Sequence, residues 1–194
     1  PPFAEDRDSI PVNPSASVMK NMLLEKVDYK FDRTYFGTWR RYVYETGARF
    51  AEFRSHDGVL GLPFLHYTAG ICPETGKRLV AKGIIAVGRK AVGVIAVGQA
   101  AAGLLALGQL AVGAIAIGQA AFGVVVIGQL AIAILFGLGQ VTTGYVAVGQ
   151  FALGYYALAQ FGFGEHVWSS RGADPEAVEF FKSYLCKTKS LFGW

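Results

Sequence analysis

The sequence predicts a mainly β protein in which residues 83–164 form a β-solenoid, that is, a chain wound into stacked coils. Two repeats predict this fold. From Ala86 onward, a five-residue unit recurs: a small residue, an aliphatic residue, glycine and two variable positions. Glutamine follows alternate glycines, which adds a ten-residue period, and an insertion near residues 135–138 shifts the frame by one. Fixed self-similarity on this scale is typical of stacked repeat architectures. The recurring glutamines are Gln99, Gln109, Gln119, Gln129, Gln140, Gln150 and Gln160.

A bundle of membrane-spanning helices is the main alternative for this segment, because its 82 residues contain no acid. The five-residue period argues against helices. A step of five residues turns a helix by about 140° beyond a full turn, so the glycines would not share one face. Glycines at helix contacts recur every four residues instead. The segment also has no polar loops, and glycine in a helix interior costs about 1 kcal/mol.

Strands fit the repeat better if the chain bends once in each unit. Side chains alternate between the faces of a strand, and an odd period breaks this alternation unless glycine supplies a bend. The repeat allows coils of about ten or about twenty residues. Equivalent residues would stack ~4.8 Å apart, with the aliphatic residue before each glycine in an inner column and alanine beside it. The glutamines are expected to form a ladder of side-chain amides.

The outward positions of the predicted solenoid are apolar, where a water-facing solenoid would carry polar residues. A long apolar surface marks contact with a partner protein or a membrane. We therefore expect an interaction surface on the repeat and on the C-terminal helix. Its candidate residues are Val94, Leu104, Leu105, Ile115, Val124, Val125, Tyr145, Tyr155, Tyr156, Phe181, Tyr184 and Leu185.

The segment before the repeat divides into an extended lead over residues 1–17 and a head over residues 18–82. Four prolines and several charges favour an extended lead. A short apolar helix is expected over Ser17 to Val27. Alternating residues from Thr38 to Ser55, interrupted at Gly47, predict a β-hairpin that caps the first coil.

A short motif precedes the repeat. Gly61-Leu-Pro-Phe-Leu-His66 leads through a turn at Pro73-Glu-Thr-Gly76 into Ala81-Lys-Gly-Ile-Ile-Ala-Val-Gly88 and the Ala-x-Gly units. This order of parts, over roughly residues 54–164, resembles a group of uncharacterised bacterial proteins with a similar lead before a glycine-rich repeat. The resemblance implies a bacterial source and a β-solenoid, and it implies no activity. The glutamines after alternate glycines depart from that group, in which glycine is common at this position.

The tail, residues 165–194, is predicted to hold an amphipathic helix that starts at Asp174-Pro175-Glu176. An aspartate cap, a proline in the first turn and an acid near the positive end of the helix dipole favour this start. Apolar residues follow at helical spacing, with lysines near the other face. The helix would cover the last coil or lie on a membrane or in a partner's groove.

The polar residues indicate no catalytic site, cofactor site or metal site. The repeat carries no histidine, no Ser/His/Asp grouping and no carboxylate, and no histidines or cysteines have the spacing of metal ligands. Cys72 and Cys186 are expected to be reduced. His66, in an apolar run, is expected to be a packed imidazole, whereas His56 and His166 are expected to be exposed. A net charge of +4 is too weak to suggest nucleic acid.

Two non-enzymatic functions remain. In the first, the solenoid is a membrane-associated scaffold or accessory subunit that packs against a membrane protein complex or lipid. In the second, solenoids assemble with other copies into a filament, as bactofilin-type solenoids do; this comparison concerns architecture only. Bulky segments at both ends of the repeat favour the first function. The sequence does not indicate the side of the membrane.

Overall fold

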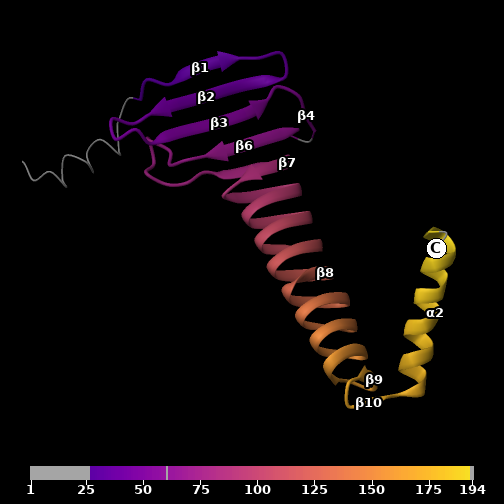
Figure 1. The fold of residues 1–194 in the computed structure, drawn as a ribbon. Coiled ribbons are helices and arrows are strands. Elements are labelled where there is room, and N and C mark those ends of the chain that lie inside the picture. The colour runs from indigo at the N-terminus through magenta and orange to yellow at the C-terminus, as the bar shows by residue number, and fades with distance from the viewer. Residues whose placement is uncertain (1–26, 60, 193–194) are drawn as a thin grey trace, which may run out of the picture.

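A computed structural model describes residues 27–59 and 61–192, with side chains through Tyr184 except for residue 60. The predicted lead over 1–17 and nearly all of the predicted helix over 17–27 lie outside these residues. The fold is mainly β, as predicted (Figure 1). Its elements are β1 (Lys30–Arg33), β2 (Gly37–Val43), β3 (Arg49–Ser55), β4 (Gly58–Val59), β5 (Leu62–Pro63), β6 (Leu65–Ala69), β7 (Val80–Gly88), β8 (Lys90–Phe163), β9 (His166–Ser169), β10 (Gly172–Ala173) and α2 (Pro175–Phe192).

The head is a small twisted sheet built around the predicted hairpin. Strands β2 and β3 pair antiparallel, and the turn between them contains Gly47 at a φ of 79°, a conformation that favours glycine. Strand β1 pairs with β2 on one side, and β6 pairs with β3 on the other. It is β6 that pairs with the solenoid, parallel to β7. The hairpin is therefore one strand removed from the first coil, rather than its direct cap.

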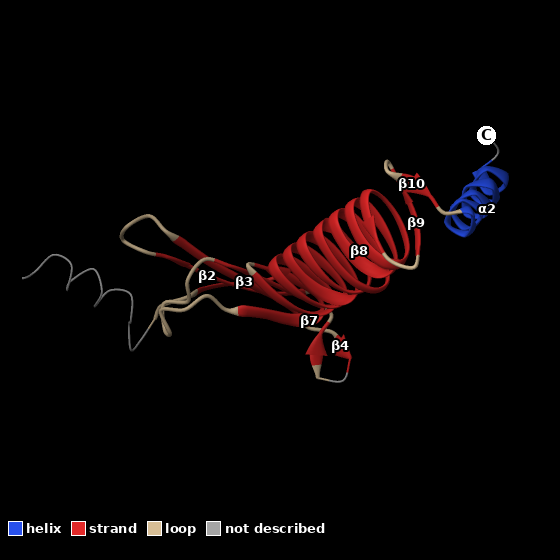
Figure 2. Cartoon of the chain, turned by 90° about the horizontal axis from the view of Figure 1, so that it is seen from below, coloured by secondary structure: helices blue, strands red, loops and turns tan. Residues whose placement is uncertain are grey.

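Strands β7 and β8 form the solenoid, which has about nine turns (Figures 1 and 2). The register shows the length of each coil: Ala81 pairs with Ala91, and Ala86 pairs with Ala96. Each coil therefore contains ten residues, the shorter of the two lengths that the repeat allows. The head strands, the coils and the last strands belong to one sheet, in the order β1-β2-β3-β6-β7-β8-β9-β10.

Alanines fill the interior of the solenoid. The small residue that opens each unit is fully buried, for example Ala86, Ala96, Ala106 and Ala116. The prediction that the aliphatic residue before each glycine points inward is wrong, because side chains at that position, such as Ile117, are exposed. A coil of only ten residues brings its two sides so close together that the interior accommodates alanine columns, and the larger side chains face outward.

The predicted insertion lies between Ala133 and Gly139, where the chain carries one extra residue. The outward side chains Ile134 and Leu135 are exposed there, and the inner column resumes at Gly137 and Thr142. Thr142 is buried beside Gly137: a Cβ atom built on Gly137 would collide with the Thr142 hydroxyl. The missing side chain at Gly137 thus makes room for a residue larger than alanine.

The tail starts by extending the solenoid. Strand β9 pairs in parallel with the last coil, for example Leu158 with Trp168, and β10 pairs antiparallel with β9. The helix α2 then begins where predicted, and an Asp174 carboxylate oxygen accepts a hydrogen bond from the Glu176 N–H at 3.0 Å. Figure 1 shows that α2 points back toward the head and diverges from the solenoid rather than crossing its end, so β9, not the helix, pairs with the last coil.

Candidate functional site: the outer surface of the solenoid

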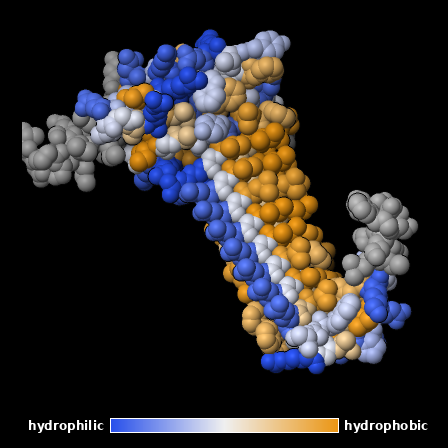
Figure 3. All heavy atoms as spheres, in the orientation of Figure 1, coloured by the Kyte–Doolittle hydropathy of each residue, from blue (hydrophilic) through white to orange (hydrophobic). Residues whose placement is uncertain are grey.

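Apolar side chains cover most of the outer surface of the solenoid. Because each coil has ten residues, side chains ten positions apart form columns along the rod. Four columns consist largely of exposed aliphatic and aromatic residues, and Figure 3 shows a broad hydrophobic surface along the rod. Representative exposed members of the four columns in order are Leu107, Leu110, Val112 and Leu104. The apolar surface therefore extends around the coil and is not restricted to one side.

The predicted interaction residues on the repeat fall into two groups. Five are exposed, and the other four are half-buried. The exposed group consists of Val94, Leu104, Tyr145 and Tyr155, which lie in one of these columns, and Ile115, which lies in the neighbouring column of Leu105. The half-buried group is Leu105, Val124, Val125 and Tyr156.

Three predicted residues lie on α2 and have different surroundings. Tyr184 is 59% exposed, whereas Phe181 is only 7% exposed. Phe181 is therefore not part of a free surface, because the first turns of α2 turn it toward the body of the protein. The side chain of Leu185 lies outside the described residues.

The prediction missed a column of aliphatic residues that the structure places on the surface. This column consists of the residues before alternate glycines, which were expected to point inward. Its exposed members are Val97, Leu107, Ile117, Ile127 and Leu138. The regular occurrence of alanine one position earlier was the signal for this arrangement, since only the smallest repeated side chain fits a coil of ten residues.

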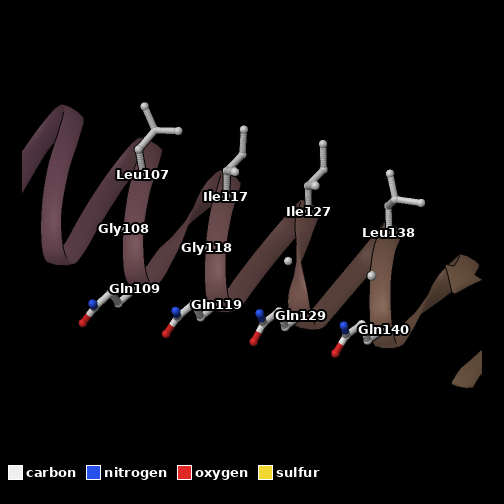
Figure 4. A pocket seen from close by; sticks show the side chains of 12 residues that line it. Leu107, Gly108, Gln109, Ile117, Gly118, Gln119, Ile127, Gln129, Leu138 and Gln140 are labelled. Atoms are coloured by element: carbon white, nitrogen blue, oxygen red, sulfur yellow. The ribbon is translucent and has the colours of Figure 1, made fainter. Parts of the chain in front are cut away.

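A polar column runs along the otherwise apolar rod. All seven predicted glutamines are exposed, and Figure 3 shows a hydrophilic stripe beside the hydrophobic surface. In Figure 4 the side chains of Gln109, Gln119, Gln129 and Gln140 point the same way from successive coils. Among the described residues no hydrogen bond joins these side chains, and the amide ladder stays a prediction.

An open groove lies between the glutamine column and the aliphatic column of Leu107. Its floor is a row of glycines whose backbone is stacked coil on coil, so that a Cβ on Gly118 would collide with the carbonyl oxygen of Gly108 (Figure 4). A second part of the groove continues from Gly108 toward the head and ends at Gly70. The groove thus follows the rod with an apolar wall on one side and an amide wall on the other.

Charged side chains lie at the two ends of the solenoid. Arg89 and Lys90 are exposed at its start. The next charged residue along the chain is Glu165, just beyond its last coil. Aromatic residues gather toward the far end, where Tyr145 stacks on Tyr155 and Phe151 stacks on Phe161, with ring centroids 5.2 and 5.1 Å apart. The rod therefore has a basic start, an aliphatic middle and an aromatic end.

Buried polar side chains hold the head against the first coil. His66 is buried, as predicted, and its Nδ1 accepts a hydrogen bond from the Lys82 N–H at 2.9 Å. Its Nε2 lies 3.1 Å from a carboxylate oxygen of Glu52, whose other oxygen accepts two hydrogen bonds from Arg40. The hydrogen bond with His66 is the main cause that lowers the pKa of Glu52, and Arg40 adds to it. Each member has a structural partner, so the cluster serves to fix the head.

A second polar cluster connects α2 with the last coil. His166 is half-buried, not exposed as predicted: its ring stacks on Tyr156, and its nitrogens lie 3.0 Å from Asp174 and 3.1 Å from Glu176. The hydrogen bond with Asp174 is the main cause that raises the pKa of His166, and the charges of the nearby acids add to it. Phe180 of α2 also stacks on the ring of Tyr156, at a centroid distance of 4.0 Å.

The two remaining sequence predictions for side chains concern His56 and the cysteines. His56 is exposed, as predicted, and its Nε2 lies 2.8 Å from the Thr38 hydroxyl. Cys72 is a buried free thiol beside the Tyr29 hydroxyl, and the reduced state of the two cysteines stays a prediction. Burial is the main cause that raises the pKa of Tyr29. The side chain of Cys186 lies outside the described residues.

Comparison with known proteins adds no relative. No family model matches the chain, and neither a curated protein nor a solved structure matches it. Among the described residues, none of the helices combines the length and the apolar character needed to cross a membrane.

Proposed function

We propose that this chain is a non-catalytic, membrane-associated scaffold whose solenoid buries its apolar outer surface against lipid or a membrane protein complex. One observation carries the proposal: exposed apolar side chains form four columns along the rod, with no charged residue between Lys90 and Glu165. An exposed apolar surface of such extent stays in water only at a high cost in free energy, at about 25 cal/mol for each Å².

The ends of the solenoid favour this function over assembly into filaments. End-to-end stacking of coils requires open strand edges, and here β6 pairs with the first coil while β9 pairs with the last. The head and the tail carry most of the charged side chains. These parts provide polar surfaces for partners while the rod is buried.

A matched pair of triple variants tests the proposal by membrane fractionation. The first, Leu107→Gln, Ile117→Gln and Ile127→Gln, makes one exposed apolar column polar over three coils. The second changes the glutamines of the same coils to leucine, at residues 109, 119 and 129. All six side chains are exposed, so both variants are expected to fold, which circular dichroism checks.

The native chain is expected to stay with membranes after a high-salt wash and to require detergent for extraction. The first variant, which introduces glutamines, is expected to shift toward the soluble fraction, because each change exchanges an apolar for a polar group. The second variant, which introduces leucines, is expected to stay bound. Equal recovery of all three chains in the soluble fraction would contradict the proposal. Large soluble polymers would instead support the filament alternative.

A further inference from the structure

The apolar surface lies on both sides of the rod and is interrupted by the glutamine column, which bears on how the rod contacts a membrane. Val112 and Ile117 lie in the two halves of one coil, and both are more than 40% exposed. Each directly follows an alanine that points inward, Ala111 in one half and Ala116 in the other. They therefore face opposite sides. A rod lying flat on a membrane would bury one of these sides and leave the other in water. Full immersion in hydrocarbon buries both.

The length of the uncharged part of the rod fits the thickness of a bilayer. Strand β8 has 74 residues, and ten residues make one coil. At a spacing of ~4.8 Å between adjacent strands, about seven coils give a length of roughly 34 Å. The hydrocarbon core of a bilayer is about 30 Å thick. The apolar segment is thus long enough to cross the core and short enough to leave both charged ends outside.

The two ends of the rod have the chemistry of membrane interfaces. Lys82, Arg89 and Lys90 are exposed on the first coils, where cationic side chains complement anionic lipid headgroups. At the far end, aromatic residues including Tyr155 and Phe161 precede the charged tail. Aromatic side chains concentrate at membrane–water interfaces. The order along the rod is therefore basic, aliphatic and aromatic, as expected for a segment that passes through a bilayer.

The backbone of the solenoid meets the requirement that hydrocarbon imposes on any spanning segment. Backbone polar groups in lipid need partners within the protein. In this fold each coil pairs with the next along the rod axis, for example Val87 with Val97, and no strand edge opens to the side. The end coils of the stack are themselves paired, the first with β6 and the last with β9. The glutamine amides, one coil apart, can bond to each other once water is removed.

We infer that the solenoid crosses the bilayer end-on, with the acyl chains of lipids around it and with head and tail on opposite sides. This inference rests on the proposed membrane association. At the far end, α2 diverges from the rod and leaves a wedge of about 380 Å³ between them. Apolar residues line the wedge, among them Val148, Leu158 and Phe180, so acyl chains can fill it.

A charge placed at one level of the rod distinguishes the possible arrangements. The variants Val112→Lys, Ile117→Lys and Gln119→Lys put the same charge on three sides of one coil, near the middle of the rod. End-on insertion predicts that all three reduce membrane integration. For the two aliphatic positions the ratio of inserted to free protein should fall about 50- to 300-fold, the penalty for lysine at the centre of a bilayer. Lys90→Gln, at the rod's start, is the control and should have little effect.

Sensitivity of only one side would show that the rod lies flat, which overturns the inference but keeps the proposed membrane association. Insensitivity of all three variants, with the protein in the soluble fraction, would overturn both. Circular dichroism identifies any variant that fails to fold.

Labelling of the head and the tail gives an independent test. In a background with Cys72→Ala and Cys186→Ser, the single variants Thr75→Cys and Ser170→Cys each place one exposed thiol in the head or the tail. Both variants are placed in sealed vesicles of phosphatidylcholine and phosphatidylglycerol and treated with a membrane-impermeant maleimide. Because the head and the tail lie on opposite sides of the membrane, the labelled fraction of one variant should equal the unlabelled fraction of the other. For uniformly oriented protein, one variant reacts and the other reacts only after detergent is added. Reaction of both before detergent, with the protein bound, would overturn the end-on arrangement.

Discussion

Replacement of Thr142 by valine is expected to stabilise the solenoid. The side chain of Thr142 is 1% exposed, and its hydroxyl oxygen has no hydrogen-bond partner among the described residues. A buried hydroxyl without a partner costs about 1–3 kcal/mol relative to water. Valine has nearly the same shape, and Val126 already occupies the facing inner column with no exposed surface. The change from hydroxyl to methyl therefore removes the penalty without overfilling the interior.

The expected gain in the free energy of unfolding is about 1–3 kcal/mol, which raises the midpoint of thermal unfolding by about 2–4 °C for each kcal/mol in a chain of this size. Thermal unfolding followed by circular dichroism measures it. Thr143→Val, at the neighbouring outward position, is the matched control and should change the midpoint little. A lower midpoint for Thr142→Val than for the native chain would refute the reasoning, because it would show that the hydroxyl donates or accepts a stabilising hydrogen bond.

Three further predictions concern the coil contacts, the head and the tail. Gly118→Ala should destabilise the fold by about 1–3 kcal/mol in denaturant unfolding, because the added Cβ collides with the preceding coil, whereas Gly172→Ala, where nothing lies within 4 Å, should not. Glu52→Ala should cost about 1–3 kcal/mol by the same assay, since its two basic partners lose their shared carboxylate; Glu52→Gln should cost less. The raised pKa of His166 implies that its contribution is complete below its unfolded pKa of about 6.5 and is lost as pH rises through the folded value. Protection of the α2 amides from hydrogen exchange, corrected for the intrinsic rate, should therefore fall as the pH rises above about 6.5 and through the raised folded pKa, and His166→Asn should remove this dependence.

The sequence predicted the architecture because the period of five restricts the geometry so strongly. The glycine spacing excluded helices, and the turn residue Gly47 located the hairpin correctly. Which residue of the five-residue unit faces inward was not predictable from apolar character alone, since alanine and the aliphatic residue after it are both suitable for an interior. What decides between them is the width of the coil, and the repeat left coils of ten and twenty residues open.

The candidate surface was only partly predictable for the same reason. Because the aliphatic residue before each glycine was expected to point inward, the exposed column of Leu107 and Ile117 was missed, although the column that contains Val94 and Leu104 was identified. Contacts between distant segments were also out of reach: the sequence spacing of His66 and Glu52 does not reveal that β3 and β6 place them side by side.

The stacking of the coils has a mechanical consequence. The hydrogen bonds between coils point along the rod, so a force that pulls the head away from the tail loads the coil contacts in series. Such a rod yields by peeling at one end, one coil at a time. Each coil shortens the rod by only ~4.8 Å but releases ten residues, or roughly 33–36 Å of extended chain. Each part of the solenoid that peels therefore becomes about seven times longer, while the coils that have not yet peeled keep their structure.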